Sequence, residues 1–240
     1  MIAKTNLDKI KETAKLLLDF PVTIPKEFGG IFVQHPIFRD RVVSRQVPKT
    51  DQNPVGLEML DIANKKDLEV AKEVYRKAFD KCESAMHVFL SINKAYSGIF
   101  FKLIKDYLDI EDYTNILETI WTSMEYPNAD VNVTKKEWIN YWKKVDLTKI
   151  YSYEDLKFLY NLPEEFYVYR GLMEGAKLEA LSWTLRLDKA IWFAKRFDRH
   201  GKVYKAKCHK KDILAYLSCR NEEEIVVDWK KLKDIEEVSY

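Results

Sequence analysis

At residues 166–171 the chain reads FYVYRG, and the character of the sequence changes here. Side chains alternate between the two faces of a strand, so residues two apart share a face. Arg170 therefore shares a face with Val168 and Phe166, at the end of an apolar strand. A buried guanidinium needs an anionic partner, and its planar donors suit a carboxylate or a phosphate. Taken alone, Arg170 is more simply interpreted as half of a structural ion pair.

Three more runs downstream have the aromatic and β-branched composition of strands: Leu181–Leu185, Lys202–Lys207 and Glu223–Asp228. A predicted helix lies between the runs 181–185 and 202–207. Asp188 can cap this helix, and its buried stripe comprises Ala190, Phe193, Ala194 and Phe197. Residues 212–216 fit a short helix or an edge strand. These patterns predict a mixed α+β region over residues 151–240.

Upstream, residues 1–150 predict a helical N-terminal region. Apolar residues at helical spacing predict a first helix that ends at Pro21: Ile10, Ala14, Leu17 and Leu18. Residues 21–55 are expected to be irregular, and residues 57–108 to form two or three helices. Thr134 with Glu137, and Ser152 with Asp155, predict the starts of two further helices. The fold class expected for the whole chain is α+β.

The composition limits the classes of function. In 240 residues, 40 Lys and Arg nearly balance 38 Asp and Glu, so the net charge of +2 does not indicate a general nucleic-acid binder. The three cysteines are widely spaced, which argues against a disulfide framework and a zinc site. Neither a signal peptide nor an apolar run long enough to span a bilayer is recognisable. We expect a cytoplasmic protein that binds no membrane and no metal.

Two further polar clusters fall on the predicted strands. Ser182 and Thr184 share one face of their strand and Trp183 lies on the other, an arrangement that can hold a carboxylate or merely fix a neighbouring strand. Glu222 and Glu224 precede an apolar strand, and alternation places both on one face. Neighbouring carboxylates repel, which raises one pKa and separates their chemical roles. A solvated acidic turn is the alternative interpretation.

The order of the three clusters adds information. A strand-end Arg170, then Ser182-x-Thr184, then Glu222-x-Glu224 resembles the Arg, Ser-x-Ser/Thr and Glu pattern of the ADP-ribosyltransferases. The chain is especially similar to ADP-ribosyltransferase-like proteins of bacteria and phages, some of them toxins of toxin–antitoxin or phage-defence systems. The resemblance covers residues 163–232. It implies that the C-terminal region is a split β-sandwich on which the helical N-terminal region packs.

The resemblance also implies a role for each residue. Glu224 would stabilise the oxocarbenium-like ribose that forms when the nicotinamide bond of NAD breaks. Glu222 would orient or deprotonate the acceptor. Arg170 would clamp the pyrophosphate, and Ser182 would orient Glu224 while Thr184 supports the strand. Two aromatic residues could line the nicotinamide pocket, although core packing is the alternative for both: Trp183 and Phe193. NAD would be a co-substrate, and the sequence contains no glycine-rich dinucleotide loop.

The expected activity is mono-ADP-ribosyl transfer to a macromolecule, either a protein or a nucleic acid such as RNA. An antitoxin protein would be a further partner if the chain is a toxin. NAD glycohydrolase activity, and a catalytically inactive binding module of the same fold, are the alternatives. Residues 121–130 resemble a segment that precedes the catalytic strands, and they could cover NAD or form a simple helix end. Two basic groups could contact phosphates or be solvated: Arg39, Arg41, Arg45 and Lys49, and Lys205, Lys207, Lys210 and Lys211.

Overall fold

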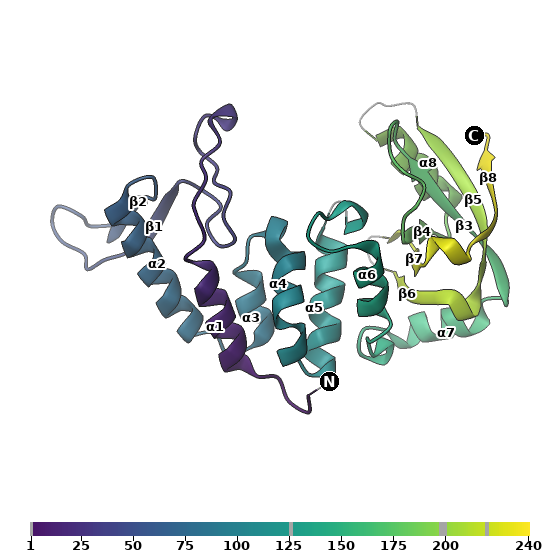
Figure 1. Ribbon diagram of the computed structural model, residues 1–240, viewed down its shortest axis with the longest axis horizontal. Helices are drawn as coiled ribbons and strands as arrows, with labels where there is room; N and C mark the ends of the chain where they lie inside the picture. Colours follow the sequence, from purple (N-terminus) through teal and green to yellow (C-terminus); the bar gives the residue numbers. More distant parts are fainter. Residues whose placement is uncertain (1, 125–126, 197–200, 219–220) are drawn as a thin grey trace. The chain divides into compact units, whose positions relative to one another are not determined.

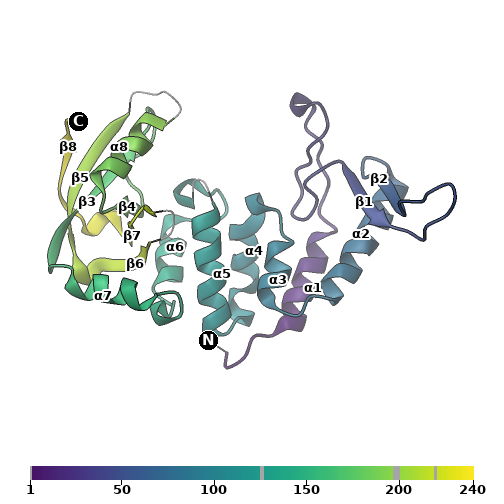
Figure 2. The same ribbon diagram turned by 180° about the vertical axis from the view of Figure 1, so that it is seen from behind.

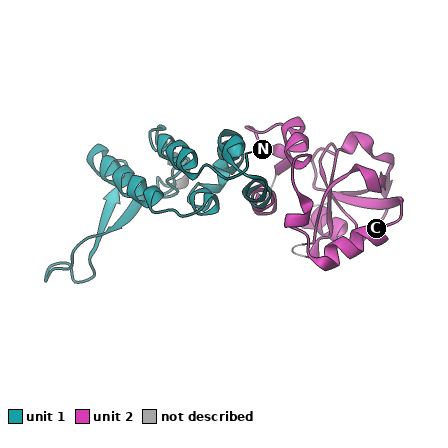
Figure 3. Cartoon of the chain, turned by 90° about the horizontal axis from the view of Figure 1, so that it is seen from below, with its two compact units in different colours: residues 1–116 teal, residues 117–240 magenta. Residues whose placement is uncertain are grey.

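The computed structural model describes residues 2–124, 127–196, 201–218 and 221–240. The chain divides into two compact units, residues 1–116 and residues 117–240 (Figure 3). The boundary falls inside helix α5 (Ile110–Ser123). Residues 117–150, which the sequence placed with the N-terminal region, therefore belong to the same compact unit as the C-terminal strands.

Unit 1 is built mainly from helices (Figure 1). They are α1 (Leu7–Leu17), α2 (Lys65–Asp80), α3 (Ala85–Leu90), α4 (Ser97–Ile104) and the first part of α5, with short 3-10 turns at Lys26–Phe28, Lys94–Tyr96 and Lys105–Tyr107. Helix α1 contacts α2, α3 and α4. Its four predicted core positions, from Ile10 to Leu18, are all buried, which confirms the amphipathic interpretation.

Unit 1 also contains an antiparallel hairpin that the sequence did not predict. Strand β1 (Val42–Gln46) pairs with β2 (Leu57–Asp61). The expectations of an irregular segment up to residue 55 and of a helix starting at residue 57 were both wrong here. The helix begins only after Asn64, whose side chain accepts hydrogen bonds from the N–H groups of Lys66 and Asp67. This cap sets the helix start, because it satisfies N–H groups that have no partner within the helix.

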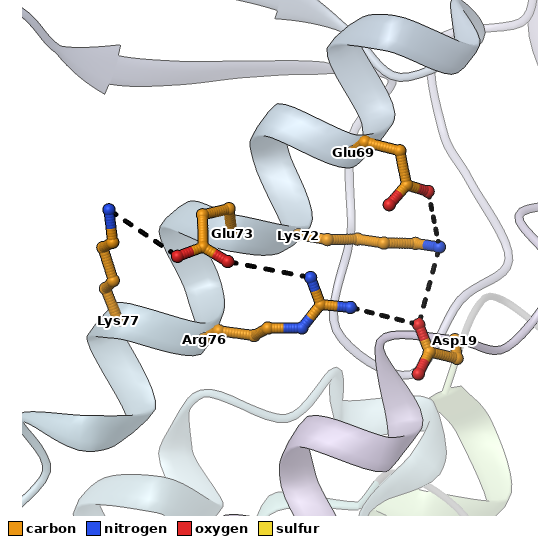
Figure 4. Close-up of polar contacts among 6 residues, drawn as sticks. All are labelled: Asp19, Glu69, Lys72, Glu73, Arg76 and Lys77. Atoms are coloured by element: carbon orange, nitrogen blue, oxygen red, sulfur yellow. Dashed lines mark hydrogen bonds and ion pairs between the residues drawn. The ribbon is translucent and has the colours of Figure 1, made fainter.

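Ion pairs connect the end of α1 to α2 (Figure 4). Asp19, just beyond α1, lies 3.3 Å from Arg76 and 3.6 Å from Lys72. Glu69 and Glu73 on α2 pair with the same two cations, and Lys77 extends the network. Most of these side chains are partly exposed, so each pair contributes about 1 kcal/mol or less. The network fixes the direction of the chain after α1 rather than supplying the main stability.

Unit 2 begins with the end of α5, followed by α6 (Lys135–Trp142) and α7 (Tyr153–Asn161). Both predicted helix starts are confirmed, and each has a capping box: Thr134 bonds reciprocally with Glu137, and Ser152 with Asp155. Each pair satisfies two N–H groups at a helix start, so the residue pattern locates the start closely. Short 3-10 turns occur at Pro127–Ala129, Leu147–Lys149, Lys210–Asp212 and Trp229–Lys231.

A six-stranded antiparallel sheet forms the rest of unit 2, in the order β6-β7-β4-β3-β5-β8. The strands are β3 (Glu165–Leu172), β4 (Ser182–Thr184), β5 (Lys202–His209), β6 (Ile213–Leu217), β7 (Glu224–Val227) and β8 (Lys233–Val238). β3 pairs with β5 over its whole length, whereas β3 and β4 share one register pair, Tyr169↔Thr184. The sheet therefore consists of two three-stranded halves that meet at a narrow junction.

Two apolar clusters pack against this sheet. The larger contains Val168, Trp183 and Ile225, and α7 adds the partly buried Leu159. The smaller joins Val203 to α8 (Leu187–Lys195), which lies along β3 and β5 (Figure 2). Gly171 lets α8 approach, because a Cβ there would lie 1.9 Å from the carbonyl oxygen of Ala190. The mixed α+β class predicted from the sequence is confirmed.

The predicted features of α8 are only partly correct. Arg186, not Asp188, is the residue before the helix, and Asp188 lies in the first turn, where it pairs with Arg186 at 2.7 Å. Ala190 and Ala194 are buried as expected, and Phe193 is half-buried. Phe197 lies outside the described residues. Among the described residues, no helix has the length and apolar character needed to cross a bilayer.

Candidate functional site

The three predicted polar clusters lie on neighbouring strands of unit 2. Arg170 is on β3, Ser182 on β4 and Glu224 at the start of β7, and the sheet order places β4 between the other two. Thr184 is the register partner of Glu224 on one side and of Tyr169 on the other. Residues from three distant parts of the sequence therefore meet at the junction between the two halves of the sheet.

The Glu224 carboxylate has two hydrogen-bond donors. The indole Nε1–H of Trp121 donates to Oε1 at 2.9 Å, and Ser182 donates from the adjacent strand. Burial raises the pKa of Glu224 above its ordinary value, whereas these two hydrogen bonds oppose the rise. The charge of Glu222 raises the pKa further and that of Arg170 lowers it. Ser182 thus lies close enough to Glu224 to affect its pKa, whereas its role in orienting Glu224 for catalysis stays a prediction.

Arg170 is a partly buried cation with few protein partners. Its Nη1 donates to the carbonyl oxygen of Ser182 at 2.5 Å, and its buried Nε has no hydrogen-bond partner among the described residues. Burial lowers the pKa of Arg170 to about 10, and the charge of Glu224 opposes this effect, so the group is charged at neutral pH. In the described part of the chain no carboxylate lies within ion-pair distance of Arg170. The structural ion pair that the sequence left open is thus not observed there.

The last residue of β4, Thr184, and Arg186 hold the backbone around Glu222 by hydrogen bonds. The Thr184 hydroxyl donates to the Glu222 carbonyl oxygen and accepts from the Arg186 N–H at 3.0 Å. The Arg186 guanidinium donates to Asn221 Oδ1 at 2.7 Å and pairs with Asp188. Thr184 thus contacts the acidic loop directly, in addition to its predicted role of supporting the strand.

The backbone of this loop does not alternate as a strand does. β7 begins at Glu224, and both Asn221 and Glu223 adopt positive φ angles, of 54° and 46°. Such conformations are uncommon for residues other than glycine and persist where surrounding contacts enforce them. Placing Glu222 and Glu224 on one face by strand alternation was therefore incorrect. The two carboxylates still interact electrostatically.

The two predicted aromatic residues occupy different environments. Trp183 is 2% exposed, its indole N–H donates to the carbonyl oxygen of Ala180 at 3.1 Å, and it belongs to the larger apolar cluster. Core packing therefore accounts for Trp183. Phe193 is half-buried on α8, with its ring 4.9 Å from that of Trp192, which is 54% exposed. No contact between Phe193 and Glu224 or Arg170 is observed in the described structure.

Trp121 is the residue at the site whose role the sequence did not indicate. The sequence left residues 121–130 open as a cover for NAD, a contact for the acceptor or a helix end, and assigned Trp121 no role of its own. Its ring is indeed buried, at 2% exposure, and only its N–H reaches a polar group. Nothing in the local sequence indicates a partner 103 positions away.

Most of the basic residues that the sequence suggested as phosphate contacts, in the segments 39–49 and 205–211, bind other groups of the protein. Arg41 binds Asp61 through two hydrogen bonds, of 2.8 and 2.6 Å, and Arg45 pairs with Glu58. Lys205 and Lys207 pair with acids of β8, and Lys210 donates to carbonyl oxygens at the end of α7. These cations are partly neutralised within the protein. They offer less attraction for phosphates than the sequence suggested.

A separate open groove of about 900 Å³ runs along α2 in unit 1. Val70 and Val74 supply part of its lining, and charged residues of both signs surround them, among them Lys66 and Glu69. The groove contains none of the predicted site residues. We regard the cluster around Glu224 as the better functional candidate, because it combines a partly buried cation, a partly buried carboxylate and fixed donors.

Comparisons of the chain with models of known protein families, with curated proteins and with solved structures find no match.

The chemistry available at the junction follows from these groups. A carboxylate held by two donors in a partly buried site can stabilise a developing positive charge, because the surrounding medium screens it less than water does. A buried guanidinium with unused donors can bind a phosphate or carboxylate. The pair therefore suits a substrate that has an anionic portion and a centre that becomes cationic during reaction.

Proposed function

We propose that the chain is a mono-ADP-ribosyltransferase that cleaves NAD and transfers ADP-ribose to a macromolecular acceptor. The observation that supports this most directly is the meeting of Arg170, Ser182 and Glu224 on three adjacent strands, with a Ser182–Glu224 hydrogen bond. The buried Nε of Arg170, which has no partner among the described residues, fits an anionic substrate. NAD supplies both an anionic pyrophosphate and a glycosidic bond whose cleavage generates a cationic ribose.

In the proposed reaction, the bond between the ribose C1′ and the nicotinamide nitrogen breaks, and its electron pair leaves with nicotinamide. Glu224 stabilises the positive charge that develops on the ribose. Arg170 binds the pyrophosphate. A nucleophilic atom of the acceptor then forms a bond to C1′ and loses its proton to Glu222. Ser182 and Thr184 do not react; Ser182 holds the Glu224 carboxylate and Thr184 holds the Glu222 backbone.

The acceptor class is part of this proposal. A protein acceptor is favoured slightly over RNA, because the Glu-x-Glu spacing resembles that of enzymes that modify arginine. The internal pairing of Lys205 and Lys207 agrees with this preference, since it removes much of the free positive charge that a phosphate backbone would require. A toxin or phage-defence role follows only from the resemblance.

Incubation of the purified protein with bacterial protein and RNA and with NAD labelled in its adenylate part tests the proposal. We expect label on macromolecules, reduced about 10²- to 10³-fold in Glu224→Gln. Glu165→Gln, which changes an exposed carboxylate at the start of β3, is the matched control and should label normally. Free ADP-ribose alone would indicate a glycohydrolase. No consumption of NAD by the wild type would refute the catalytic proposal and favour an inactive binding module.

Growth provides a second test. Expression of the wild type in a bacterium should slow growth, and expression of Glu224→Gln should not. Equal growth of both cultures would count against a toxic role while leaving the enzymatic proposal to the labelling experiment.

A further inference from the structure

The hydrogen bond between Trp121 and Glu224 links the sheet to the helices that precede it. Trp121 lies near the end of α5, and its Nε1 is 2.9 Å from Oε1 of Glu224. A hydrogen bond to an ionised group is stronger than one between neutral groups. Trp121 is thus a specific partner of the carboxylate as well as a packing residue.

The Trp121 ring is held in place by two other tryptophans. Trp138 and Trp142 of α6 lie edge-to-face against it, with ring centroids 5.7 and 5.6 Å away. All three rings are at least 98% buried. Close packing of this kind fixes a side chain in one rotamer, so the direction of the Trp121 N–H is set by α5 and α6.

We propose that Trp121 is a positioning residue for Glu224, which its indole N–H holds in the orientation needed for catalysis. This inference rests on the proposed function, because it assigns Trp121 to the same carboxylate. Ser182 supplies a second donor from β4. Two donors from different elements restrict rotation of the carboxylate more than one would, and they fix where its negative charge lies.

The charged and polar groups around Glu224 determine how its titration depends on Trp121. Arg170 of β3 and Glu222 of the preceding loop carry charge, Ser182 of β4 and Trp121 of α5 donate hydrogen bonds, and the register partner on β6 is the apolar Leu217. The Trp121 N–H favours the ionised carboxylate. Its loss leaves Ser182 and Arg170 to oppose the effects of burial and Glu222.

Trp121→Phe tests this role, with Trp142→Phe as the matched control. Both changes replace a buried indole of the same cluster with a smaller ring. The N–H of Trp142 has no hydrogen-bond partner among the described residues, however, so only the first change removes a donor from Glu224. We expect kcat for NAD cleavage to fall about 10- to 100-fold more in Trp121→Phe than in Trp142→Phe. The acidic limb of the kcat–pH profile should move to higher pH in Trp121→Phe alone, with a similar loss of Tm in both variants.

Nuclear magnetic resonance gives a readout that does not depend on NAD. The indole N–H resonance of Trp121, assigned by its absence in Trp121→Phe, should shift with pH in the wild type, and this transition should disappear in Glu224→Gln. The Trp142 resonance should show no such transition.

These outcomes separate the two proposals. If the wild type cleaves NAD but the two tryptophan variants have equal kcat and equal pH profiles, the role of Trp121 is refuted and the proposed function stands. If the wild type cleaves no NAD, the proposed function fails, and with it the catalytic role of Trp121. The resonance then still decides whether Trp121 holds Glu224: a pH transition that persists in Glu224→Gln would refute the contact.

Discussion

Arg170 combines partial burial with an incomplete set of partners. Its Nη1 uses one backbone carbonyl, and its Nε has no partner in the described structure. Burying a charged group is costly unless an opposite charge compensates it, and the charge of Glu224 does so only in part. An anionic ligand would provide the missing compensation. A purely structural role would instead lead us to expect an ion pair with a described carboxylate.

Replacing Arg170 by lysine should separate charge from geometry. Lysine keeps the positive charge but lacks the planar set of donors that can bind Ser182 and a pyrophosphate together. We expect the affinity for NAD to fall about 10- to 100-fold, which corresponds to the loss of one or two charged hydrogen bonds. Isothermal titration calorimetry measures this change. Arg45→Lys, which alters an ion-paired arginine of β1, should bind NAD as the wild type does.

Glu224→Gln should change stability as well as activity. Burial raises the pKa of Glu224 above its ordinary value of 4.5, so the folded protein holds this proton more tightly than the unfolded chain does. The resulting stability is present below pH 4.5 and is lost as pH rises through the folded pKa. We therefore expect Glu224→Gln to have a higher Tm than the wild type at pH 7. Calorimetry at pH 4 should show a smaller difference, and a lower Tm for the variant at pH 7 would contradict this account.

The sequence predicted that Arg170, Ser182 and Glu224 come together, and the sheet places them on adjacent strands. Their spacing and order along the chain can be seen in the sequence, and the resemblance rested on them. Trp121 was not recognisable as a partner of Glu224, because their contact depends on the tertiary fold. The interpretation of Trp183 as a pocket residue was left open, and only its packing identified it as a core residue. The sequence of one strand does not show which of its side chains are buried or which residues they contact.

At the level of elements, the end of β4 and the residues that follow it bind residues 221–223, which precede β7. Thr184 and Arg186 bind the loop, and Leu185 donates its N–H to the Glu223 carbonyl oxygen at 3.1 Å. The positive φ angles of Asn221 and Glu223 are thus supported by several hydrogen bonds. These hydrogen bonds hold residues 221–223 in one conformation, and such order in advance would lower the entropy cost of binding a ligand there.

Gly171→Ala should weaken the packing of α8 on β3. The added Cβ would lie 1.9 Å from the Ala190 carbonyl oxygen and 2.7 Å from the Ala194 nitrogen, so backbone must move. We expect a loss of about 2–4 kcal/mol in the free energy of unfolding, measured by denaturant titration. Gly175→Asn is the control. Position 175 has open space and a φ of 79°, which asparagine tolerates, so stability should stay within about 1 kcal/mol of the wild type.

The elements themselves were predictable where local signals are strong. The capping boxes located α6 and α7, and β3 and β5 fell close to the predicted ranges. β8 was missed, because its sequence KDIEEV is charged and mostly exposed and so lacks the apolar alternation of a half-buried strand. Its pairing with β5 relies on ion pairs such as Lys205–Glu236, which sequence periodicity does not reveal.

For the whole molecule, the division into two compact units bears on how the site responds to ligand. All the side chains of the proposed site belong to residues 117–240. The predicted boundary at residue 150 differs because residues 117–142 read as helical and were grouped with the other helices. A helix joins one compact unit or the other through its tertiary contacts, such as the hydrogen bond between Trp121 and Glu224, and not through its secondary-structure type.

Hydrogen exchange should therefore respond to NAD in one unit. We expect slower amide exchange in β4, β7 and the end of α5 when NAD is added to Glu224→Gln, a variant chosen because it should bind NAD without consuming it. Amides of residues 2–116 should exchange as before, because this unit contains none of the proposed contacts. Equal protection in both units would contradict the placement of the site.

The position of Trp121 sets a limit on how this protein can be shortened. A fragment starting at residue 151 would keep Arg170, Ser182 and Glu224. It would lack Trp121, however, whose indole N–H donates to the side-chain carboxylate of Glu224. Such a fragment would contain the full motif, and we expect it to lack the proposed activity. A shortened version of the protein should therefore begin before α5, so that it keeps Trp121, Trp138 and Trp142 as well as the motif.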